Sequence, residues 1–111
     1  MPGVVFSGLS SPSRGATENA VWRIRLEPRN VGSTHQLTRE ETIVATSGTA
    51  VATLDGVEYT LSVGSAIIIP PHVDFSLSNP YADAFEAVAV LPIGGQACIG
   101  DAPPFTPPWA M

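Results

Sequence analysis

Residues 32–48 read GSTHQLTREETIVATSG, and this stretch raises the question of what the protein does. His35 and Glu41 stand six positions apart, and Leu37 lies between them. Histidine and glutamate bind transition metals and also move protons in enzymes, whereas leucine does neither. The stretch therefore leaves two interpretations open, a metal site and a pocket that works without a metal.

The chain around this stretch alternates apolar and polar residues with a period of two, which is typical of half-buried β-strands. In AVWRIRLEP, at residues 20–28, Trp22, Ile24 and Leu26 alternate with charged residues. Further strands are predicted at THQL, ETIVATSG, DFSLSN and AFEAVAVLP. The continuous apolar run AIII, which follows Gly64, predicts a strand buried on both faces.

A hairpin is predicted where TAVATL and VEYTLSV meet at Asp55 and Gly56, because this pair suits the positive φ angles of a tight turn. Short strands with turn signals about every ten positions predict an all-β sandwich or barrel. The eleven prolines and ten glycines among 111 residues fit this turn-rich class, and the length suits a single domain.

The charge balance excludes some functions. Ten acidic residues against five basic ones give a net charge of -5, so we expect no binding to nucleic acid or to anionic membranes. All five basic residues are arginines, which leaves no lysine for Schiff-base chemistry. The single Cys98 has neither a disulfide partner nor a zinc or redox motif. Neither a signal peptide nor an apolar run of about 18 residues is evident, so we expect a cytoplasmic protein.

Three regions are expected along the chain. Residues 1–19 form a flexible N-terminal arm that adds one edge strand at Val4, Val5 and Phe6, and residues 20–92 form the barrel. The proline-rich tail at residues 93–111 carries Phe105 and Trp109, which are costly to leave in water. The tail therefore packs either on its own barrel or on a partner subunit, and both alternatives stay open.

The order of glycines, prolines, histidine and glutamate resembles a small single-domain cupin of the RmlC-like superfamily, of the conserved-barrel cupin 2 type. The first cupin motif runs glycine, histidine, histidine, glutamate, glycine. From the first histidine onward, the spacing of this motif is reproduced by His35, Leu37, Glu41 and Gly48, with Leu37 in the place of the second histidine. Gly32 lies closer to His35 than the motif requires.

The second cupin motif falls on residues 64–79, where histidine replaces its second glycine and Phe75 replaces its histidine. Its five places are occupied in order by Gly64, Pro70, His72, Phe75 and Asn79. The resemblance covers residues 20–92 and implies an all-β antiparallel barrel, jelly-roll-like and of the double-stranded β-helix type. It also implies a homodimer and a small-molecule ligand in the barrel.

Cupins typically hold Fe, Mn, Zn or Ni through three histidines and one glutamate. Only His35 and Glu41 carry over as ligands, because Leu37 and Phe75 offer no lone pair. Since catalytic metal sites usually supply three protein ligands, we favour no metal cofactor. This is a degenerate ligand set.

One rearrangement would restore a two-histidine, one-carboxylate triad of His35, Glu41 and His72. It requires the turn at Pro70 and Pro71 to swing His72 inward. In an extended strand, positions three apart face opposite sides, so the geometry speaks against this triad.

Without a metal, Leu37 and Phe75 make the barrel centre apolar, which should raise the pKa of Glu41 toward neutrality. His35 lies on the adjoining inward face, so the pair predicts acid–base catalysis on one bound substrate. Metal-free cupins include sugar epimerases and small cyclases. The resemblance thus implies a metal-independent isomerisation, cyclisation or elimination on a small organic substrate, with His35 and Glu41 as the catalytic residues.

Two rival functions remain. One is a metal-dependent, oxygenase-like cupin that uses the triad, and the other is a ligand-binding module without turnover, in which His35 and Glu41 hydrogen-bond to each other.

The expected substrate-binding set, besides Leu37 and Phe75, has three further residues, and each has two possible orientations. Arg23 and Arg25 would grip a carboxylate or phosphate if their face of the strand looks into the barrel, and otherwise they are solvated. Tyr59 is either a pocket hydroxyl or a cross-strand packing residue. Trp22 is expected in the core or at a dimer face.

Overall fold

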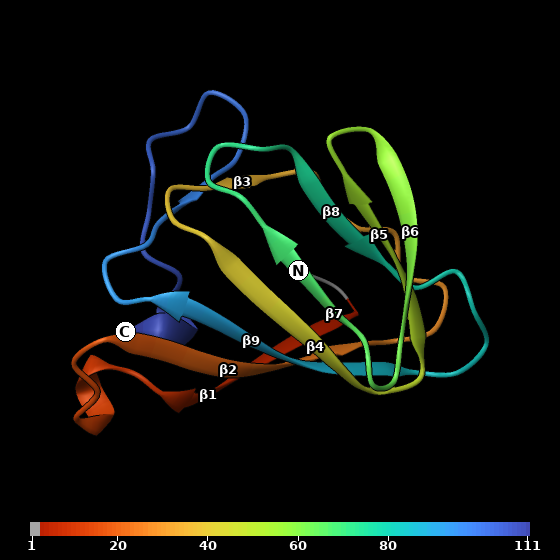
Figure 1. Cartoon of the computed structure of the whole chain (residues 1–111), viewed down its shortest axis with the longest axis horizontal. Helices are drawn as coiled ribbons and strands as arrows, with labels where there is room; N and C mark the ends of the chain where they lie inside the picture. Colours follow the sequence, from red (N-terminus) through yellow and green to blue (C-terminus); the bar gives the residue numbers. More distant parts are fainter. Residues whose placement is uncertain (1–2) are drawn as a thin grey trace.

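The computed structural model describes residues 3–111, and these residues fold into an all-β architecture of antiparallel strands (Figure 1). The fold class expected from the sequence is therefore confirmed. Helical structure in this part of the chain is limited to two short 3₁₀ turns, η1 (Pro12–Arg14) and η2 (Pro108–Ala110). Among the same residues, no helix has the length and apolar character needed to cross a membrane.

The strands form a five-stranded sheet that faces two smaller sheets. The large sheet has the order β1-β2-β9-β4-β7, with bounds β1 (Val4–Ser10), β2 (Asn19–Leu26), β4 (Glu41–Ser47), β7 (Ala66–Ile69) and β9 (Phe85–Pro92). The three-stranded sheet has the order β6-β5-β8, with bounds β5 (Thr49–Leu54), β6 (Val57–Ser62) and β8 (Phe75–Ser78). The smallest sheet pairs β3 (Gln36–Leu37) with β10 (Ala97–Cys98).

The core lies between the large sheet and the smaller ones, and the period-two pattern builds it. Along β9, Phe85, Ala87, Ala89 and Leu91 are at most 1% exposed, while their neighbours point outward and are half-buried. Along β2 the same alternation buries Trp22 together with Ala20, Ile24 and Leu26. Side chains of successive strand residues point to opposite faces, so one face of each strand enters the core.

The predicted hairpin is present between β5 and β6. Asp55 and Gly56 have φ angles of 50° and 79°, which is the left-handed conformation that a tight hairpin turn requires at both positions. Leu54 and Val57 face each other across this turn, and the pairing continues to Thr49 and Ser62.

The prediction that AIII is buried on both faces is wrong. β7 lies at the edge of the large sheet and pairs with β4. Ile69 is fully buried and Ile67 is half-buried, but Ile68 is 58% exposed on the outer face. An unbroken apolar run shows that a strand is apolar on both faces, and it does not show what covers the second face.

The N-terminal segment contributes a longer strand than the short edge strand expected at Val4, Val5 and Phe6. β1 pairs with β2 from Val4 opposite Leu26 to Ser10 opposite Val21, with an irregularity between Gly8 and Ser10. The segment before the barrel is thereby part of the large sheet.

The C-terminal tail packs on its own barrel. The Trp109 ring stacks on the Phe6 ring, with centroids 3.9 Å apart, and lies at a tilt to Trp22 at 6.4 Å. Phe105 exchanges two backbone hydrogen bonds with Ala97 at 2.8 and 3.0 Å.

Candidate active site

A cavity of about 130 Å³ lies inside the barrel, and both ends of the chain help to enclose it. Side chains from β1, β2, β4 and β8 form about half of its wall, and the tail closes it with Phe105, Pro107 and Trp109. Most of the lining is aliphatic or aromatic. A site of this kind, an apolar cavity with a few polar groups, is typical of small-molecule binding.

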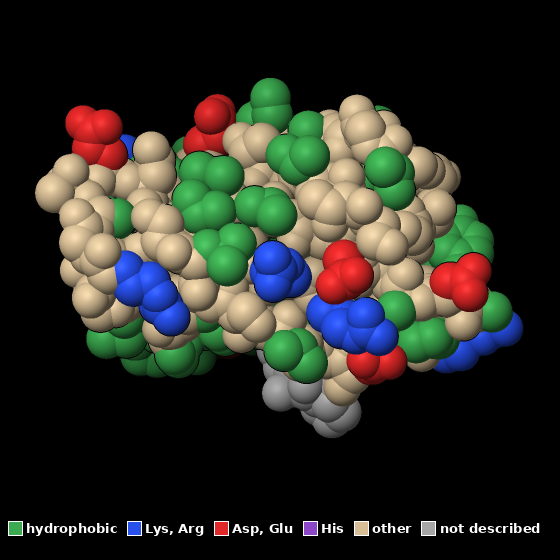
Figure 2. All heavy atoms as spheres, turned by 90° about the horizontal axis from the view of Figure 1, so that it is seen from below, with side chains coloured by type: hydrophobic (Ala, Val, Ile, Leu, Met, Phe, Trp, Pro, Cys, Tyr) green, Lys and Arg blue, Asp and Glu red, His purple; other side chains and the backbone are tan. Residues whose placement is uncertain are grey.

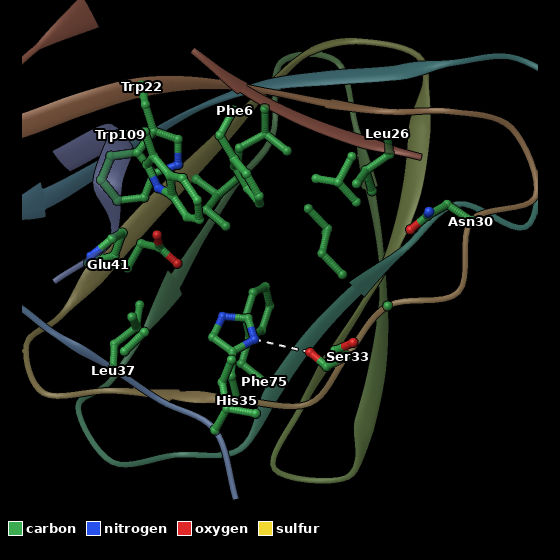
Figure 3. A pocket seen from close by; sticks show the side chains of 18 of the residues that line it. Phe6, Trp22, Leu26, Asn30, Ser33, His35, Leu37, Glu41, Phe75 and Trp109 are labelled. Carbon is green, nitrogen blue, oxygen red and sulfur yellow. Dashed lines mark hydrogen bonds between the residues drawn. The ribbon is translucent and has the colours of Figure 1, made fainter. Parts of the chain in front are cut away.

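Four residues of the two sequence motifs meet in this cavity: His35, Leu37, Glu41 and Phe75 (Figure 3). Leu37 is 4% exposed and Phe75 is 2% exposed, so both contribute buried apolar surface. His35 and Phe75 are joined directly, because each backbone N–H donates to the other residue's carbonyl oxygen at 2.9 Å. Their rings meet edge to face with centroids 5.7 Å apart.

The backbone fixes the tautomer of His35. Its Nδ1 lies 3.0 Å from the carbonyl oxygen of Ser33. A carbonyl oxygen only accepts hydrogen bonds, so Nδ1 carries the proton in the neutral ring and Nε2 keeps a free lone pair. In Figure 3 the bonded nitrogen faces Ser33 and the other nitrogen faces the cavity. His35 therefore presents a proton acceptor to the cavity.

Glu41 presents a proton donor to the same cavity. It is the first residue of β4 and points inward with Ile43 and Ala45, so that it is only 5% exposed. Burial raises the pKa of its carboxyl group to about 8, because an apolar surrounding disfavours the charged form. At pH 7 this carboxyl group is mainly neutral and carries an O–H.

The side chains of His35 and Glu41 are not bonded to each other. Within residues 3–111, no hydrogen bond joins the side chains of His35 and Glu41, and the His35 ring is instead bonded to Ser33. The ligand-binding alternative supposes a hydrogen bond between the His35 and Glu41 side chains, and the described residues do not form it. Each group is available to a molecule in the cavity.

Arg23 and Arg25 lie outside the cavity, on the outer face of β2, which is the solvated alternative that the sequence left open for them. The alternation of β2 sends Trp22 and Ile24 inward and both arginines outward. Arg25 instead forms a surface ion pair with Glu27 at 3.1 Å and approaches Glu86 at 4.0 Å. Figure 2 shows such mixing of basic and acidic side chains on the face seen from below.

Tyr59 also lies outside the cavity. It is 50% exposed on β6, where it faces Ala52 across the hairpin, and it borders a separate shallow groove together with residues of β7. The cross-strand position is the more common of the two expected for it.

His72 does not join His35 and Glu41. It is exposed in the turn after β7 with a φ angle of 61°, and its backbone N–H donates to the Leu37 carbonyl oxygen at 2.8 Å. Within residues 3–111, no three side chains of the His, Cys, Asp or Glu type are grouped to hold a metal ion. The donor set at the barrel centre is one imidazole and one carboxyl, which does not fit the three-ligand site of a catalytic metal.

Sequence reasoning missed several residues that line the cavity. Phe6 and Trp109 come from the two ends of the chain, and Trp22 was expected in the core or at a dimer face. The signal for Trp109 was present, because a large aromatic side chain in a tail must cover some apolar surface. The sequence did not show which surface it covers.

Several solved structures share the fold of this chain. No curated protein matches the chain at a significant level. A polyketide cyclase from Streptomyces resistomycificus has a TM-score of 0.75 and 19% identity, over 82% of this chain and 66% of the cyclase chain. A salicylate 1,2-dioxygenase from Pseudoaminobacter salicylatoxidans, solved with gentisate, has a TM-score of 0.79 and 15% identity, over 92% of this chain and 30% of the other.

An RmlC-like cupin from Shewanella frigidimarina has a TM-score of 0.71 and 20% identity, over 81% of this chain and 76% of the other. At these identities the similarities concern the fold. The Cupin_2 family model, a cupin domain, matches residues 22–91, which is more than half of the chain. The chain therefore belongs to the cupin family.

Proposed function

We propose that this cupin binds a small, largely apolar organic compound in its barrel and catalyses a proton transfer without a metal. One observation carries the proposal: an imidazole with a free Nε2 lone pair and a neutral carboxyl group face the same apolar cavity. An acid and a base held on one small molecule are the requirement for general acid–base catalysis. Isomerisation, cyclisation and elimination are the reactions that this pair serves.

The proposed step uses both groups together. His35 Nε2 takes a proton from a carbon atom of the bound compound, and the C–H electron pair moves into the compound. Glu41 O–H gives its proton to the atom where that electron density arrives. Imidazolium and carboxylate result, and a second transfer in the opposite sense, at a different carbon, restores both groups and completes an isomerisation. The pKa of Glu41 near 8 suits this exchange at neutral pH.

The similar fold of a polyketide cyclase is compatible with this class of chemistry, whereas the dioxygenase raises the metal-dependent alternative. That alternative would need a third protein donor beside His35 and Glu41, and His72 is exposed elsewhere. The non-catalytic module would bind the same ligand and return it unchanged.

The test is hydrogen exchange in deuterated water. Wild-type protein is incubated with a panel of small apolar carbon acids, such as ketones, aldehydes, esters and nitroalkanes, and deuterium uptake is followed by NMR. We expect at least one compound to exchange faster than in buffer. The rate should fall about 100-fold or more in His35→Asn, whose amide N–H can still reach the Ser33 carbonyl, and also in Glu41→Gln.

Each variant has a matched control on the surface. His72→Asn and Glu40→Gln change the same residue types at exposed positions, and both should keep the wild-type rate. Loss of exchange on adding a chelator would support the metal-dependent alternative instead. Binding of panel compounds with no exchange in wild-type protein would show a ligand-binding module.

We also propose that two copies associate in the cytoplasm through the outer face at β4 and β7. Val44 and Ala66 face each other there, Ile68 is in the same row, and all three are exposed. An uncovered apolar strip on a sheet edge favours association. Sedimentation of wild type against Ile68→Glu tests this, because the variant should be monomeric if the proposal holds.

A further inference from the structure

Two buried hydrogen-bond donors without a partner belong to residues of the cavity wall. The indole Nε1 atoms of Trp22 and Trp109 are both buried, and neither has a hydrogen-bond acceptor within residues 3–111. Both tryptophans line the cavity that also holds Glu41. The rings of Trp22 and Trp109 have centroids 6.4 Å apart, and Figure 3 draws both on the side of the cavity where Glu41 is labelled.

Both indole rings are held firmly in place. Trp22 is 3% exposed and points inward from β2, between the buried positions of Ala20 and Ile24. Trp109 lies in the short turn η2 rather than in a strand. Its ring is held by a near-parallel stack on the Phe6 ring, with centroids 3.9 Å apart, and by a tilted contact with the Trp22 ring, with centroids 6.4 Å apart. Their N–H groups are therefore preorganised rather than free to turn toward solvent.

Unpaired buried donors are rare in folded proteins, because burying an N–H without an acceptor loses its hydrogen bond to water. Two of them, on neighbouring rings of one cavity wall, are better explained by an acceptor that arrives with the ligand. Tryptophan N–H groups only donate, so the arriving group must be an acceptor, and oxygen is the usual one.

The charge of the cavity limits which oxygen this is. None of the cavity residues in the described chain is an arginine, and the chain has no lysine. A carboxylate or phosphate would therefore enter an apolar space without a counter-charge and beside a carboxyl group, which is unfavourable. A neutral carbonyl oxygen meets neutral N–H donors at no such cost.

The size of the cavity is also informative. Its volume of about 130 Å³ is close to that of apolar cavities of roughly 150 Å³ that accept benzene. A compound with one six-membered ring and a carbonyl group matches both the space and the donors.

We propose that the indole N–H groups of Trp22 and Trp109 hold the carbonyl oxygen of a small neutral ketone or aldehyde, which is the substrate. This rests on the proposed function and names its substrate class. The two tryptophans thereby act as an oxyanion-type site. His35 Nε2 removes the proton from the carbon next to the carbonyl, the C–H electron pair forms the C=C bond, and the carbonyl π pair moves to the oxygen. Glu41 O–H then protonates that oxygen, giving an enol.

The test uses cyclohexanone and methylenecyclohexane, which have the same shape and differ in the oxygen. The chain has two tryptophans, so a nitrogen–proton NMR spectrum has two indole signals, and both belong to the site. We expect cyclohexanone to move both indole N–H signals downfield, in the direction of a stronger hydrogen bond. Methylenecyclohexane at the same concentration should not do so.

Variants of the two tryptophans test whether the indole N–H groups cause the preference for cyclohexanone over methylenecyclohexane. Trp22→Phe and Trp109→Phe keep an aromatic ring and remove the N–H, and Tyr59→Phe serves as a control outside the cavity. Each tryptophan variant should weaken cyclohexanone binding about threefold to tenfold, which is the usual effect of losing one neutral hydrogen bond. Binding of methylenecyclohexane should change less than twofold. If a variant does not fold, the wild-type indole signals still decide the result.

The outcomes separate this inference from the proposed function. Downfield indole shifts with no hydrogen exchange would support the carbonyl site and contradict the enzyme. Hydrogen exchange that depends on His35 and Glu41 would support the proposed enzyme. If cyclohexanone leaves the indole signals unmoved in the same protein, the carbonyl site is contradicted and the enzyme is not. Equal affinity for the two probes, or binding of neither at millimolar concentration, also overturns the carbonyl site.

Discussion

Among single residues, Leu37 and Phe75 decide the character of the candidate site, because they occupy two places where the cupin motifs have metal-binding histidines. Leu37 and Phe75 offer no lone pair and line the cavity together with Glu41, whose own burial raises the pKa of its carboxyl group to about 8. This much followed from the sequence, because the spacing of the two motifs places these positions on one inward face. The role of Ser33 did not, since a backbone carbonyl that fixes a histidine tautomer has no sequence signal.

The tautomer of His35 is the first prediction. The bond from Nδ1 to the Ser33 carbonyl should hold the neutral ring with its proton on Nδ1, which is the less common neutral form in water. Nitrogen NMR of the two histidines measures this directly. His72, which is exposed, is the internal control and should show mainly the Nε2 proton. The same pattern at both histidines would contradict the assigned geometry.

The second prediction restores the ligand set. In the double variant Leu37→His and Phe75→His, three imidazoles and the Glu41 carboxyl group would face one cavity. We expect this variant to bind one Zn²⁺ or Ni²⁺ per chain, more tightly as the pH rises, because the ligands must lose protons. Calorimetric titration against wild-type protein checks it. A folded variant that gains no stoichiometric metal would show that the four positions do not converge.

At the scale of elements, strand identity was largely predictable and strand environment was not. The period-two pattern of β2 and β9 and the Asp55-Gly56 turn all appear where the sequence places them. Local pattern carries this information because side chains alternate along every strand. The pattern of β2 also separates Trp22 from Arg23, but the sequence did not say which of these faces is the interior. The prediction that β7 is buried on both faces was wrong for the same reason, because tertiary structure decides what covers the outer face of a strand.

The turns between strands provide the third prediction. Gly48 and Gly64 both have positive φ angles, 75° and 87°, but they differ in surroundings. A Cβ at Gly48 would overlap the Ala84 backbone oxygen, whereas a Cβ at Gly64 meets nothing within 4 Å. Gly64→Ala should therefore cost about 1–2 kcal/mol for the backbone conformation alone. Gly48→Ala should cost about 1–3 kcal/mol more, because backbone must shift.

Urea unfolding of the two glycine variants gives both values on one scale. Equal destabilisation would mean that the β4–β5 turn relaxes freely away from Ala84.

At the scale of the whole molecule, the cavity is built by segments that are distant in the sequence. β1 pairs along β2 at one end of the chain, and Trp109 from the other end stacks on Phe6 of β1. The sequence could predict that Phe105 and Trp109 cover apolar surface, but not that they complete the wall of the site. Long-range packing of this kind has no local pattern, and it explains why the indole donors were not foreseen.

The fourth prediction concerns stability as a function of pH. In the unfolded chain Glu41 ionises near 4.5, whereas in the folded protein it keeps its proton up to about 8. Between these values the unfolded state binds fewer protons, so stability should fall as the pH rises from about 5 to about 8 and then level off. The full effect is on the order of 5 kcal/mol.

Urea unfolding between pH 5 and 9 measures this contribution. Glu41→Gln, which is neutral at every pH, should remove most of the decline, and Glu40→Gln at the exposed neighbouring position should not. Parallel curves for wild type and Glu41→Gln would contradict the burial of an ionisable group.

The proposed chemistry depends on a neutral carboxyl group of Glu41 that faces the cavity at pH 7. Carbon NMR of the side-chain carboxyl of Glu41, assigned by comparison with Glu41→Gln, follows its titration directly. We predict a midpoint near 8, because burial raises the pKa of this carboxyl group. A midpoint near the ordinary 4.5 would contradict it, because an ionised Glu41 has no proton to give at pH 7.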